Sequence, residues 1–219
     1  MDCKIIFMVV AMLSPDAIHA QTQDGNQSSK STLPRAVQNH NRWAMDPKSW
    51  GLPNATDVKV AKRTAAQGHA PAQFRLALMY DRGWGVQQSE IKAVKWLRKA
   101  AEQDFAEAQY NLGSRYESGQ GVTQDHAEAA NWFRKAAEQG SVNAQKNLGA
   151  MYGLGQGVPG NYSEAYVWSS IAAESGDIGA IVNRNLAANK LSSDQLNIAQ
   201  KRATDLYEEI QQRSLENHQ

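Results

Sequence analysis

The segment AEAQYNLGSRYESGQGV (residues 106–122), followed by HAEAANWFRKAAEQG (126–140), decides the fold of this chain. In the first segment Ala108, Leu112 and Tyr116 stand four residues apart, which places them on one face of a helix. The second segment carries a similar stripe of alanine and tryptophan. A glycine can adopt the left-handed conformation that ends a helix, so the Gly-x-Gly-Val between the stripes indicates a turn. Together the two segments predict an antiparallel helix hairpin.

The hairpin recurs along the chain with a period of 36 residues. Identical residues occupy the same place in successive copies: Ala72, Ala108, Ala144 and Ala180; Gln73, Gln109 and Gln145; Tyr80, Tyr116 and Tyr152; Gly83, Gly119 and Gly155; Gly85, Gly121 and Gly157; Trp96, Trp132 and Trp168. One hairpin cannot bury its own apolar stripe, so neighbouring copies must stack. A period of this length predicts a solenoid of helix pairs.

Residue spacing also marks where helices start. Three pairs have the spacing of a capping box, in which a side chain at the helix start and one three residues later satisfy free N–H groups. They are Asp125 with Glu128, Asn161 with Glu164, and Ser192 with Gln195. No segment has the alternating pattern of a strand, and the expected fold class is therefore all-α.

These copies resemble the Sel-1-like repeat family, a relative of the tetratricopeptide repeats. The resemblance spans roughly residues 57–188 and implies a right-handed α-α superhelix of hairpins. Val60 stands where later copies have tryptophan, and Arg184-Asn185 stands where Leu-Gly belongs. Terminal repeats are often atypical, because they cap the array. We therefore expect a solenoid over 56–188, followed by a capping helix and tail over 189–219.

The first 55 residues differ from the repeats. Residues 1–20 have the features of a secretory signal peptide: Lys4, an apolar run at 5–13, and small residues before a cut after Ala20. Residues 21–55 are rich in Gln, Asn, Ser and Pro, which indicates a flexible leader. Trp43 and Trp50 are unusual in such a segment. They could cover the first helix of the solenoid as a cap, or they could bind a partner.

Composition narrows the function classes. The 219-residue chain has 23 Lys+Arg and 22 Asp+Glu, so no overall charge favours nucleic acid or an anionic membrane surface. Its one cysteine, Cys3, lies in the signal peptide. The mature chain would then have neither a disulfide nor a thiol nucleophile. We expect it to be periplasmic or secreted, with no membrane insertion after cleavage.

No pattern points to catalysis. Gly-x-Gly follows a helix here, whereas a dinucleotide site needs a strand before it. No two histidines have the spacing of zinc ligands, and no Gly-x-Ser-x-Gly or Ser-x-x-Lys motif is present. We therefore expect no enzyme activity, no catalytic residue, no metal and no cofactor.

The candidate binding residues follow from the resemblance, since the helix bearing Leu-Gly-x-x-Tyr lines the concave groove in tetratricopeptide-like hairpins. The groove positions of a first helix lie two residues before the leucine, two residues after it, and about one helical turn further along. They predict a groove lined by Phe74, Leu78, Asp81, Tyr110, Ser114, Glu117 and Lys146. One repeat position holds Phe74, Tyr110 and Lys146 in turn, and such divergence is typical of a surface that recognises a ligand. Drift at an exposed site, or burial of the rings under the leader, would also account for it.

Sel-1-like proteins generally act as scaffolds, so the resemblance implies an exported adaptor that binds another protein or a peptide in this groove. Two alternatives stay open. One is a peptidoglycan-associated envelope component. The other is a β-lactamase-like or penicillin-binding enzyme, although the paired cysteines of the subgroup that such enzymes resemble are absent here.

Export gives the first testable prediction. The protein isolated from its native compartment should begin at Gln21, because cleavage after Ala20 removes the apolar segment. N-terminal sequencing checks this. A product that still begins at Met1 would show that residues 1–20 are not a cleaved signal.

Overall fold

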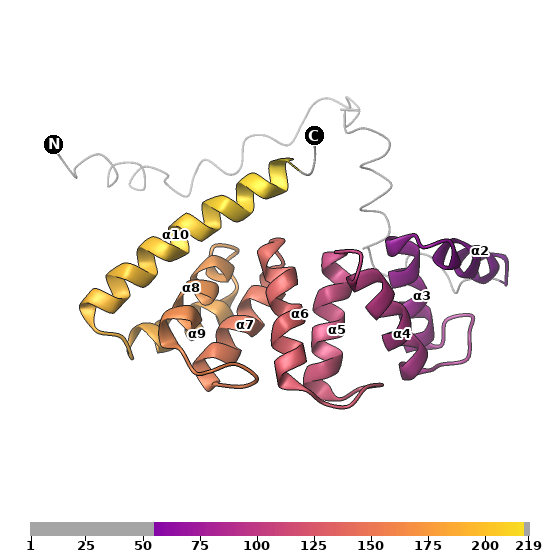
Figure 1. Ribbon diagram of the computed structural model, residues 1–219, viewed down its shortest axis with the longest axis horizontal. Coiled ribbons are helices and arrows are strands. Elements are labelled where there is room, and N and C mark those ends of the chain that lie inside the picture. The colour runs from indigo at the N-terminus through magenta and orange to yellow at the C-terminus, as the bar shows by residue number, and fades with distance from the viewer. Residues whose placement is uncertain (1–54, 217–219) are drawn as a thin grey trace, which may run out of the picture. The chain divides into compact units, whose positions relative to one another are not determined.

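The structure is a computed structural model that describes residues 55–216. The predicted signal peptide and the predicted leader with Trp43 and Trp50 lie outside the described residues. Within 55–216 every regular element is an α-helix, and the helices follow one another in a row (Figure 1). The prediction of an all-α solenoid is confirmed.

Three helix hairpins form the centre of this row. In each hairpin the first helix carries the Leu-Gly-x-x-Tyr type of stripe and the second carries the tryptophan. The first helices are α3 (Ala70–Arg82), α5 (Ala106–Ser118) and α7 (Val142–Leu154), and the second helices are α4 (Glu90–Ala101), α6 (His126–Glu138) and α8 (Tyr162–Ala173). Each helix contacts the next one along the chain. The hairpins therefore stack in sequence order.

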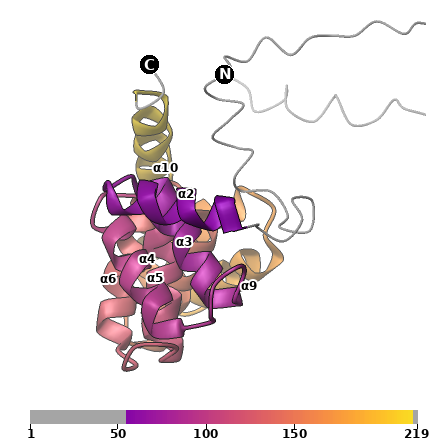
Figure 2. The ribbon, with the colours of Figure 1, turned by 90° about the vertical axis from the view of Figure 1, so that its right-hand side faces the viewer.

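The array ends in unpaired helices. α2 (Ala55–Ala66) is a lone second helix that packs on α3 and faces the viewer in Figure 2. At the other end α9 (Ile178–Ala188) is a lone first helix that packs on α7 and α8. α10 (Ser193–Glu216) does not complete a hairpin with α9, since it packs along α8 instead.

Both departures from the repeat pattern fall on these ends. The leucine before α7's glycine, Leu148, is fully buried, whereas its counterpart Arg184 is partly exposed and Asn185 beside it is exposed. No second helix covers that side of α9, so polar side chains suit it. Val60 on α2 is 48% exposed for the same reason, because no first helix precedes α2 among the described residues.

The two glycines of each turn differ in role: the first ends a helix, and the second allows a close approach to a neighbouring helix. Gly119 has φ 73° and ends α5, with its N–H donating to the carbonyl of Arg115. Gly157 has φ 69°, and a Cβ there would lie 2.1 Å from the carbonyl oxygen of His126, the first residue of α6. The second glycine of the motif thus allows a turn to touch the start of a helix in the preceding hairpin.

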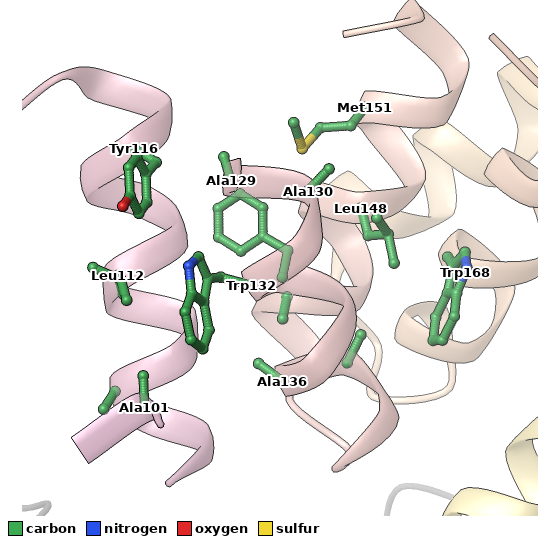
Figure 3. Close-up of a cluster of buried hydrophobic side chains, with 14 of the residues drawn as sticks. Ala101, Leu112, Tyr116, Ala129, Ala130, Trp132, Ala136, Leu148, Met151 and Trp168 are labelled. Atoms are coloured by element: carbon green, nitrogen blue, oxygen red, sulfur yellow. The ribbon is translucent and has the colours of Figure 1, made fainter. Parts of the chain in front are cut away.

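The core consists of alanines that allow close helix approach and of larger side chains that fill the remaining gaps. Ala108, Ala129 and Ala136 are fully buried, and Trp132 is 8% exposed (Figure 3). The Nζ atom of Lys135 lies 4.5 Å from the centre of the Trp132 ring. Burying an indole of ~200 Å² contributes on the order of 5 kcal/mol.

A hydrogen-bonded glutamine joins each hairpin to the helix before it. Gln73, Gln109 and Gln145 are buried. Their Nε2 atoms donate to the carbonyl oxygens of Ala65, Ala101 and Ala137, at 3.1, 3.2 and 3.1 Å. In two copies a further glutamine, Gln103 or Gln139, donates to the Oε1 atom of the buried one at 2.7 Å. The bonds to the alanine carbonyls link each first helix to the end of the preceding second helix. Gln103 and Gln139 follow the second helix of the same hairpin, so their bonds lie within a hairpin.

Trp132→Ala should lower the free energy of unfolding by about 3–5 kcal/mol, the usual cost of emptying an aromatic core site. Val60→Ala is the matched control, because it occupies the equivalent position on α2 and is half exposed; its cost should stay below about 1 kcal/mol. Urea unfolding followed by circular dichroism measures both. Equal effects at the two positions would contradict the assigned repeat register.

Gly157→Ala tests the close approach between hairpins. Gly176 also has positive φ, but no atom lies within 4 Å of a Cβ there, so Gly176→Ala carries only the backbone penalty of about 1–2 kcal/mol. Gly157→Ala should cost about 1–3 kcal/mol more, because the methyl group meets main-chain atoms that cannot rotate away. Thermal or urea unfolding of the two variants checks the difference. Equal costs would mean that the turn does not depend on this contact.

Candidate protein-interaction face

The seven residues predicted to line the groove lie on first helices. α3 carries Phe74, Leu78 and Asp81, α5 carries Tyr110, Ser114 and Glu117, and α7 carries Lys146. All seven are partly buried. The face formed by these positions on α3, α5, α7 and α9 is called the first-helix face below.

Two aromatic members of the set contact other rings of this chain. The ring centre of Phe74 lies 5.4 Å from that of Phe105, the residue that precedes α5, with an angle of 57° between the planes. The ring centre of Tyr110 lies 5.8 Å from that of Phe133 on α6. Both distances are typical of stabilising aromatic pairs. These rings therefore contribute to packing between and within hairpins.

Two charged members form ion pairs between repeats. Asp81 pairs with Arg115 on α5. The Nζ atom of Lys146 lies 3.0 Å from Oδ2 of Asp177, the residue that caps the start of α9. The backbone N–H of Ala180, and then Lys146, hold the pKa of Asp177 below its ordinary value. Lys146 thus supports the start of the last repeat.

These contacts give another reason why the repeat position of Phe74 and Lys146 holds different residues in different copies. Phe74 with Phe105, and Lys146 with Asp177, occupy the same pair of repeat positions, 31 residues apart. An apolar pair in one repeat is replaced by an ionic pair in another, so each residue matches its partner in the chain. The difference between Phe74 and Lys146 follows from packing and does not by itself indicate a ligand. The binding role of the seven residues stays a prediction.

The first-helix face continues onto α9, beyond the last residue predicted from the sequence. Val182 and Leu186 stand 36 residues after Lys146 and Ala150, and they are 49% and 60% exposed. Ile178, one turn earlier, is 78% exposed. The three residues form an apolar stripe on the open side of α9, here called the α9 stripe. The 36-residue period applied once more would have found it.

A row of asparagines flanks this face, one residue after the position that holds Tyr110, Lys146 and Val182. Asn111, Asn147 and Asn183 stand 36 residues apart on α5, α7 and α9, and each is partly buried. The Nδ2 atom of Asn111 donates to the carbonyl of Glu107 at 2.7 Å. The side chains of Asn147 and Asn183 form no hydrogen bond with any described residue. The residue is the same in these three copies, so divergence between copies does not reveal the row.

Outside this face, the described residues show few features of a metal or catalytic site. Among residues 55–216 no group of three or more His, Cys, Asp or Glu side chains could hold a metal ion. None of the described helices has an apolar stretch of the length that a bilayer crossing requires. An open cleft of about 430 Å³ lies beside the end of α10, and neither histidine nor cysteine lines it.

The comparisons with known proteins agree with this architecture. The family model for the Sel1 repeat matches residues 70–105, 106–141 and 142–177. It leaves out the two atypical ends that the wider resemblance over 57–188 included. No curated protein matched the chain.

Two solved structures are similar to the chain. One is a protective antigen of uropathogenic Escherichia coli with an SLR fold, 33% identical over 80% of this chain, with a TM-score of 0.68. This chain spans only 37% of that protein. The other is a Sel1 repeat protein from Oxalobacter formigenes, 36% identical over 59% of this chain and 97% of that one, with a TM-score of 0.55. The repeats, the helix order and both structures place the chain in the Sel1 repeat family.

Proposed function

We propose that this protein is an exported scaffold that binds another protein or a peptide on the first-helix face. Sel1 repeat solenoids are typically interaction scaffolds without catalytic activity. The stacking of hairpins uses the opposite sides of the helices, where the glutamines and alanines are buried. Within residues 55–216 the exposed part of the first-helix face, above all Val182 and Leu186, is left open to a partner.

The α9 stripe is the observation that carries this proposal. Three large apolar side chains, four residues apart, point away from the helices that α9 packs on. Covering an aliphatic side chain of this size contributes about 1.5–3 kcal/mol. A contiguous apolar surface of this kind is typical of an interaction site. A partner that covers the stripe would gain binding energy at no cost to the fold.

Export is the second part of the proposal, and it rests on the signal-like residues 1–20. Similarity to a protein described as a protective antigen supports it, because an antigen that protects must be reachable by the immune system. An exported scaffold would meet its partner in the periplasm or outside the cell.

Glutamate at the α9 stripe provides the test. Val182→Glu with Leu186→Glu should reduce capture of the partner at least tenfold, since two charges would have to be desolvated on binding. The matched control is Ile91→Glu with Ile198→Glu, which changes two similarly exposed residues on α4 and α10. Tagged full-length chains are used to purify partners from the native cell envelope, and mass spectrometry quantifies them.

Both double variants should keep the helical circular dichroism of the unmodified protein, because all four positions are exposed. The proposal is contradicted if the α9 variant recovers the same proteins in the same amounts as the control.

A further inference from the structure

We propose that Asn111, Asn147 and Asn183 bind the main chain of an extended peptide segment of the partner. This inference rests on the proposed function and specifies how the first-helix face recognises its ligand. The amide groups would supply binding that does not depend on the peptide's side chains, and the α9 stripe would select an apolar side chain at one end.

Stability does not account for the asparagine row. In the interior of a helix asparagine is less favourable than alanine by roughly 0.7 kcal/mol. Asn147 and Asn183 recover nothing through hydrogen bonds to described residues, while Asn111 bonds only to its own helix. The same unfavourable residue nevertheless stands at one position of three successive first helices. A ligand that uses the amide groups explains why asparagine occupies all three.

The chemistry of the amide suits a peptide backbone. Each asparagine offers two N–H donors and one carbonyl acceptor. A peptide unit presents the complementary pair, one C=O and one N–H, whatever its side chain. A row of amides can therefore hold a backbone of any sequence, provided that the backbone is extended and its groups are not paired within a helix.

The spacing of the row also suits an extended chain. α7 and α9 are in direct contact, and the axes of contacting helices lie roughly 8–10 Å apart. An extended chain advances about 3.3 Å per residue, so Asn147 and Asn183 would meet it at positions about three residues apart.

The neighbouring side chains define the two ends of such a segment. Ser114 and Ala150, beside the first two asparagines, are small, which leaves room for a backbone to approach. Val182 and Leu186 flank Asn183 and are exposed. The segment would therefore carry an apolar side chain where it crosses α9.

Random 12-residue peptides displayed on phage, selected against the full chain, provide the probe. The most enriched peptide is synthesised with a fluorescent label, and its affinity is measured by fluorescence anisotropy. Asn147→Ala with Asn183→Ala should weaken binding at least tenfold. Asn131→Ala, which changes an exposed asparagine of the second helix α6, should leave affinity within twofold. The double variant should melt at the same temperature as the unmodified protein or higher, since alanine favours the helix.

A second readout separates main-chain recognition from other contacts. Methylation of single backbone nitrogens of the peptide should weaken binding to the unmodified protein at positions about three residues apart. The double asparagine variant should lose this sensitivity. A double variant that binds within twofold of the unmodified protein, while the Val182→Glu, Leu186→Glu variant loses the peptide, overturns the asparagine inference and leaves the proposed function standing. If no peptide is enriched, and no partner is purified from the native cell envelope, both the asparagine inference and the proposed function are overturned.

Discussion

The array depends on one buried hydrogen bond per repeat, from a first-helix glutamine to the last turn of the helix before it. Gln109 is fully buried, and an unpaired amide there would cost about 1–3 kcal/mol. The bond to the carbonyl of Ala101 is available only when the preceding hairpin is in place. Each hairpin therefore needs its predecessor, and this requirement fixes both the order and the register of the stack. The buried alanines and the second turn glycine also allow neighbouring helices to approach closely.

In the proposed function, stability and recognition use different sides of the first helices. The buried side carries identical residues at several positions of the three central copies, among them Gln73, Gln109 and Gln145, since the same packing problem recurs there. The open side carries residues that the stack does not require, and there the asparagine row and the α9 stripe are found. Lys146 and Phe74 lie at the boundary, where a neighbouring repeat supplies their partners. A mutation on the open side should therefore leave the stack intact, provided that it avoids these boundary pairs.

The sequence predicted the fold well because the fold is encoded locally and repeatedly. Tyr116 and Tyr152 stand one period apart, and the same spacing holds for most core residues. The candidate site was harder to predict. The pairing of Phe74 with Phe105 joins positions 31 residues apart, which no period reveals until the helices are placed. The course of α10 along α8 is also not readable from its polar sequence, since only Ala199, Ala203 and Ile210 are buried.

The most direct test of the account follows the side-chain amide signals of the protein by nuclear magnetic resonance while the selected peptide is added. Glutamine and asparagine amides report on the two sides of the first helices in one spectrum. We expect the signals of Asn111, Asn147 and Asn183 to shift in proportion to the bound fraction. The signals of Gln73, Gln109 and Gln145 should stay in place, because their bonds within the stack do not change. Shifts confined to the second helices or to α10, with the three asparagine signals unmoved, would contradict it.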